Sequence, residues 1–138
     1  MNPYYKFRTI AASNNLAEGV YFLDPILVFL IAGAFAMSAA IFASKLLKLP
    51  VDEQPEWAQG KSGNVRILLG GNLFAIALIA AVVYGFYHLV WWIPVACLFI
   101  TFPVIHVIIL EKILSPGKGF LFSGICTVAC LPLLWLYW

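Results

Sequence analysis

The chain has 138 residues, of which 64% are hydrophobic and 10% are charged. Soluble domains are about half apolar and about a quarter charged, so this composition excludes an ordinary soluble protein and indicates an integral membrane protein. The formal net charge of +2 is small and dispersed along the chain, which excludes a nucleic-acid-binding protein.

The N-terminal tail, residues 1–23, mixes aromatic and aliphatic side chains with polar ones. This mixture favours an outward-facing segment that lies in the membrane interface with its apolar side toward the lipid. A disordered terminus is the alternative.

Four apolar stretches follow the tail, and each reaches the length of about 20 residues that a helix needs to cross a bilayer. They are residues 24–46, 66–87, 91–112 and 119–138. Because lipid offers the backbone no hydrogen-bond partners, these stretches must be helices. The predicted fold is all-α: a polytopic membrane protein in which residues 24–138 form a compact bundle of four transmembrane helices.

The basic residues predict the orientation of the bundle. Six of the eight Lys and Arg residues lie in or beside the loops 47–65 and 113–118: Lys45, Lys48, Lys61, Arg66, Lys112 and Lys118. Basic loops tend to stay in the cytoplasm, so both loops are expected inside and both termini outside, in a bacterial-type inner membrane. Aromatic residues gather at the outer ends of the spans and predict one interfacial belt: Tyr21, Phe22, Tyr84, Tyr87, Trp91, Trp92, Trp135, Tyr137 and Trp138.

Small residues recur every four positions in the first two spans. The sets are Ala32, Ala36, Ala40 and Ser44 in the first span, and Ala77, Ala81 and Gly85 in the second. Such stripes allow helix backbones to approach closely, so they are predicted helix-packing faces, either within the bundle or between chains.

One polar residue from each span is expected at a similar depth in the membrane. At 1.5 Å per residue, Asn72 and His106 both lie about 9 Å inside the cytoplasmic boundary. Ser38 and Ser123 fall close to that height on the other two helices. We predict a polar layer, which either fixes helix register through hydrogen bonds, with His106 bonded to Asn72, or lines a ligand site or a conduit. Pro103 near His106 permits a local kink.

Charged residues are confined to the ends of the spans. Glu111 is expected to pair at the membrane boundary with Arg66, Lys112 or Lys118. No carboxylate or basic side chain is placed deeper, which argues against a self-contained ion-coupled pump.

Catalytic and cofactor sites are not predicted. No nucleophile and base fall at matching depth, so the chain is not expected to be an enzyme. His88 and His106 lie at opposite ends of neighbouring spans, which prevents both from binding one heme iron. Cys126 and Cys130 share a helix face at a spacing too wide for a disulfide, and they are interpreted as small buried residues rather than metal ligands. We therefore expect no metal and no cofactor.

These features predict a small integral subunit of a larger inner-membrane assembly of the transport or secretion type. It would act by helix packing and partner binding, and its partners would be the lipid bilayer and other membrane subunits or further copies of itself. The alternatives are a homo-oligomeric channel or facilitator, an immunity protein that binds a membrane-directed toxin, and a heme-carrying membrane anchor.

Overall fold

The structure, a computed structural model, describes residues 24–138. The tail 1–23, with its predicted interfacial position, and the belt residues Tyr21 and Phe22 lie outside the described residues. The described part of the chain contains helices and no strand, and four of its helices are long and apolar enough to cross a membrane. The predicted all-α fold of four transmembrane helices is confirmed, and the chain is an integral membrane protein.

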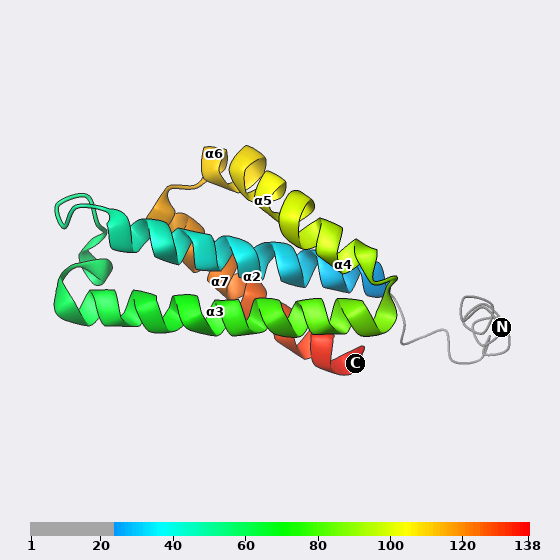
Figure 1. Cartoon of the computed structure of the whole chain (residues 1–138). Coiled ribbons are helices and arrows are strands. Elements are labelled where there is room, and N and C mark those ends of the chain that lie inside the picture. The colour runs from blue at the N-terminus through cyan, green and yellow to red at the C-terminus, as the bar shows by residue number, and fades with distance from the viewer. Residues whose placement is uncertain (1–23) are drawn as a thin grey trace, which may run out of the picture.

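The four spans are α2, α3, a composite third span and α7 (Figure 1). Their bounds are Pro25–Lys48 for α2, Gly60–His88 for α3, Trp92–Ile113 for the third span and Pro116–Leu136 for α7. The third span is built from α4 (Trp92–Ala96), η2 (Cys97–Thr101), α5 (Phe102–Ile105), η3 (His106–Leu110) and α6 (Glu111–Ile113). The short helix η1 (Glu56–Ala58) lies between α2 and α3.

The helix α2 is the centre of the bundle. It packs along α3 and α7 and also contacts the third span through η2, α5 and η3, whereas the third span has only a small contact with α3. Figure 1 shows α2 running beside α3 with the third span on its other side. Consequently α3 and the third span each leave much of their surface outside the bundle.

The packing of α2 on α3 uses small residues, as predicted for part of both stripes. Ala32 and Ala36 on α2 are buried, and so are Ala77, Ala81 and Gly85 on α3. The approach is close: a Cβ on Gly85 would lie 2.9 Å from the Phe29 ring. The first stripe then departs from its predicted course, because Ala40 is only half-buried and Ser44 is exposed. Residues four apart are rotated by about 40° on an α-helix, so the buried face passes instead through Ala39 and Ala43.

The third span contains two π-helical turns that flank α5. The N–H of Phe102 donates to the carbonyl of Cys97, and the N–H of Glu111 donates to the carbonyl of His106, each five residues back. Pro103 lies between these turns, lacks an N–H and crowds the preceding turn. The first of these turns contains Phe99, four residues before Pro103, so the irregularity expected near Pro103 takes the form of a widened turn there.

The loop between α2 and α3 folds against the bundle rather than extending away from it. The side chain of Gln54 is buried and donates hydrogen bonds to the carbonyls of Leu46 (3.1 Å) and Leu49 (2.9 Å) at the end of α2. Trp57 stacks on Phe120 of α7 with ring centroids 6.0 Å apart. The helix α3 begins at Gly60, six residues before the predicted apolar stretch 66–87. Its first turns therefore consist mainly of glycine and polar residues that precede the apolar run.

The opposite end of the bundle carries the aromatic residues. Tyr87, Trp91, Trp92, Trp135 and Trp138 are exposed there, as an interfacial belt requires. Tyr84 differs, because it is fully buried and packs on His88 and Trp138 with ring centroids 4.3 Å and 6.1 Å away. It belongs to the core rather than to the belt.

Candidate functional site

Three of the four predicted layer residues lie inside the bundle. Ser38, His106 and Ser123 are exposed by 1% or less. Phe42 connects the three helices that carry them: its ring lies 4.6 Å from the His106 ring, and a Cβ on Gly119 would meet it at 2.5 Å. Ser38 precedes Phe42 by one turn and Ser123 follows Gly119 by one turn, so the two serines lie at matching heights on antiparallel helices.

The buried polar atoms of this layer have no hydrogen-bond partners. Both ring nitrogens of His106 and the hydroxyls of Ser38 and Ser123 are enclosed without a partner within the described residues. An unsatisfied buried polar group costs about 1–3 kcal/mol. His106 is instead held by ring packing, in an edge-to-face arrangement with Phe42.

Asn72 does not join this layer, which corrects the predicted pair with His106. Its side chain is exposed on α3, and it has no hydrogen bond within residues 24–138. Depth along the membrane was predicted from residue spacing, which does not determine the direction in which a side chain points. Nine residues separate Asn72 from the buried Ala81, and at 3.6 residues per turn this spacing puts the two on opposite faces of α3.

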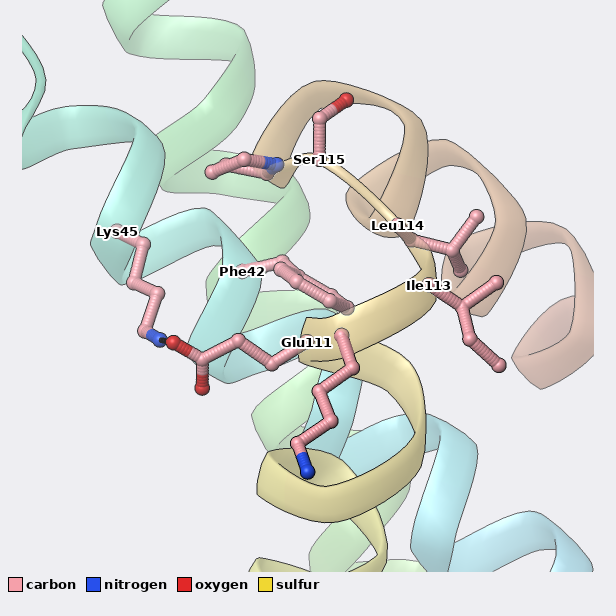
Figure 2. Close-up of a pocket in the computed structure, with 8 residues that line it drawn as sticks. Phe42, Lys45, Glu111, Ile113, Leu114 and Ser115 are labelled. Carbon is pink, nitrogen blue, oxygen red and sulfur yellow. Dashed lines mark ion pairs between the residues drawn. The ribbon is translucent and has the colours of Figure 1, made fainter.

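An ion pair joins α2 to the third span at the end of the bundle that carries the lysines. The carboxylate of Glu111 binds the amine of Lys45 across the boundary between α6 and α2 (Figure 2). The predicted partners of Glu111 were Arg66, Lys112 and Lys118, but these three side chains are exposed and form no ion pair with it. The sequence places Lys45 at the same boundary, yet only the contact between α2 and the third span identifies it as the partner.

A pocket of about 320 Å³ lies beside this ion pair. Phe42 and Lys45 line it from α2, Glu111 lines it from the third span, and Ser115 lines it from the link before α7 (Figure 2). Lys112 also lines the pocket, and the only ion pair among the described lining residues is that of Lys45 with Glu111. Sequence reasoning did not identify Phe42 or Gln54, and it named Lys45 only as a basic residue at the boundary.

The remaining candidate ligands do not converge. Within residues 24–138, no three His, Cys, Asp or Glu side chains are placed to hold a metal ion. Cys97, Cys126 and Cys130 are all free thiols, and His88 ends α3 at the aromatic end, far along the bundle from His106.

No family model, curated protein or solved structure matches this chain.

Proposed function

We propose that this protein is a small integral subunit of a membrane assembly of the transport or secretion type, and that it works by binding partner helices rather than by catalysis. The proposal places it in a bacterial-type inner membrane with both termini outside. The observation that carries it is the exposed amide of Asn72 on the outer face of α3.

An amide that faces lipid is energetically unfavourable. Asn72 is the only amide or charged side chain between Ile67 and Tyr87, and its neighbour Leu73 is 64% exposed. Moving an unbonded amide from water into alkane costs about 4–8 kcal/mol. Polar residues at this depth normally face protein and hydrogen-bond across helices. A second helix against the outer face of α3 would remove the cost.

The buried layer supports a subunit over the alternative of a homo-oligomeric channel. A central pore between copies is lined by side chains on the outer surface of each copy. Ser38, His106 and Ser123 are enclosed within one copy, so they are not available to line such a pore.

Photocrosslinking in intact membranes tests the proposal. A benzoyl-phenylalanine replaces Ile76, which is 61% exposed on the outer face of α3, or Ile125 on α7, which is 70% exposed and serves as the control. We expect protein adducts from position 76 and mainly lipid adducts from position 125. The change Asn72→Leu should reduce the adducts at position 76 without affecting folding, since Asn72 has no partner within the described chain.

Lipid adducts alone at position 76, as at position 125, would contradict the proposal.

A further inference from the structure

The outer face of α3 carries a continuous seam with the spacing of a coiled coil. We define the α3 seam as the positions that alternate in steps of four and three: Val65, Leu69, Asn72, Ile76, Ile79, Val83 and Phe86. All seven side chains are exposed, the apolar ones by 37% to 62%. Side chains in this 3.5-residue repeat lie on one line along the helix, which is the geometry of a left-handed helix pair. Because lipid is as apolar as these side chains, the attraction to a partner comes from the polar Asn72 rather than from the apolar repeat.

The α3 seam is separate from the contact with α2. The buried residues Ile67, Ala77 and Ala81 define the face of α3 that packs inside the bundle. Asn72 lies two and a half turns from Ala81, so it is on the opposite side of the helix. A second helix can therefore occupy the seam while the described bundle stays intact. The seam covers 21 residue steps, about 32 Å, which matches the thickness of the hydrocarbon core.

We propose that the α3 seam binds the α3 seam of a second copy of this chain, in a parallel dimer with Asn72 opposite Asn72. The inference rests on the proposed function and names its partner. A twofold axis along the membrane normal brings identical residues together at identical depth. Each Asn72 therefore faces the Asn72 of the other copy at the same depth, and the partner needs no other polar residue at that position.

The chemistry of the amide fits this pairing. An asparagine side chain contains both donors and acceptors, so two of them can exchange hydrogen bonds with each other. A single asparagine in an apolar heptad seam also fixes the register and the number of strands, because every other register leaves it unpaired. Leu68 and Leu73 flank Asn72 at 53% and 64% exposure and would shield the amide pair from lipid.

Cysteine scanning of α3 in native membranes tests the dimer. Single cysteines replace residues 68–71 and 73–80 in turn, in a chain whose Cys97, Cys126 and Cys130 have been changed to alanine, and each variant is treated with a mild oxidant. In a symmetric parallel pair, a cysteine meets its own equivalent. We expect disulfide-linked dimers to peak at positions 69, 76 and 79 and to be weak at 74 and 78, which face the bundle; position 72 is left as asparagine because a cysteine there would remove the amide.

The amide is tested separately by the monomer–dimer equilibrium in detergent, measured by energy transfer between labelled copies. Asn72→Leu should weaken the dimer about threefold to twentyfold, the equivalent of losing one interhelical hydrogen bond in a membrane protein. Asn72→Gln retains the amide and should weaken it less.

Two outcomes overturn the inference, and they differ in what they mean for the proposed function. In the first outcome, disulfides are absent or show no periodicity, and position 76 forms photoadducts with a different protein. The α3 seam would then bind another subunit, which contradicts the dimer and agrees with the proposed function. Absent disulfides together with lipid adducts alone would remove both.

Discussion

At the scale of single residues, His106 is the least expected feature of the core. It lies between helices with both ring nitrogens unpaired, and its contact is the ring of Phe42. A leucine would fill a similar space without the cost of burying unbonded nitrogens. The histidine therefore either lowers the stability of the bundle or uses its ring nitrogens to bind a ligand.

We expect His106→Leu to raise the free energy of unfolding by about 1–3 kcal/mol, because it removes buried polar atoms that have no partner. The free energy is measured by unfolding the purified protein in mixed micelles of a mild detergent and a denaturing detergent. His106→Gln keeps polar atoms at the position and serves as the control, with no stabilisation expected. A destabilised leucine variant would contradict this expectation.

The rotation of residues about the helix axis could not be predicted from the sequence. Spacing placed Asn72 and His106 at one depth, but Asn72 is exposed and His106 is buried. Likewise, the four-residue stripe in α2 predicted Ser44 as a packing residue, whereas the helical repeat turns it outward. The stripe in α3 held over Ala77, Ala81 and Gly85 because it is too short to drift off the buried face.

At the scale of elements, the apolar runs predicted all four spans, because in lipid an apolar run of this length has no alternative to a helix. They did not predict the start of α3 at Gly60, since hydropathy reports where lipid begins rather than where a helix begins. They also did not predict the folded loop, which is held by the bonds of Gln54 to the end of α2 and by the stacking of Trp57 on Phe120.

Gln54→Leu is expected to lower the free energy of unfolding by about 1–3 kcal/mol. It removes the side-chain donor from the carbonyls of Leu46 and Leu49 at the end of α2, and the Leu46 carbonyl keeps only the N–H of Leu49, at 3.3 Å. The same micelle unfolding assay measures the loss, and proteolysis of the loop should become faster. Glu53→Leu is a matched control, because Glu53 is exposed on the same loop and no side-chain bond is lost. Equal stability of the two variants would refute the role given to Gln54.

At the scale of the whole molecule, the two ends of the bundle differ in chemistry. One end carries the ion pair of Lys45 and Glu111 together with exposed lysines, and the other carries exposed Trp and Tyr side chains. Basic residues favour the cytoplasmic side, so we expect the loop before α3 inside and the N-terminus outside.

Single cysteines at Asn2 and Lys61, in a chain without its native cysteines, report this orientation. In intact cells an impermeant thiol reagent should label the Asn2→Cys variant and spare the Lys61→Cys variant. After permeabilisation both should react, which controls for access. The opposite pattern in intact cells would reverse the proposed topology.

The stacking of Trp57 on Phe120 has a consequence for the order of assembly. Trp57 lies in the first loop of the bundle, and Phe120 lies in its last helix, so more than sixty residues are synthesised between them. Until the ribosome has released α7, the loop lacks its apolar cover. The hairpin of α2 and α3 can therefore insert before Trp57 has its stacking partner. The contact between Trp57 and Phe120 forms only after α7 has inserted, so it belongs to a late step of assembly.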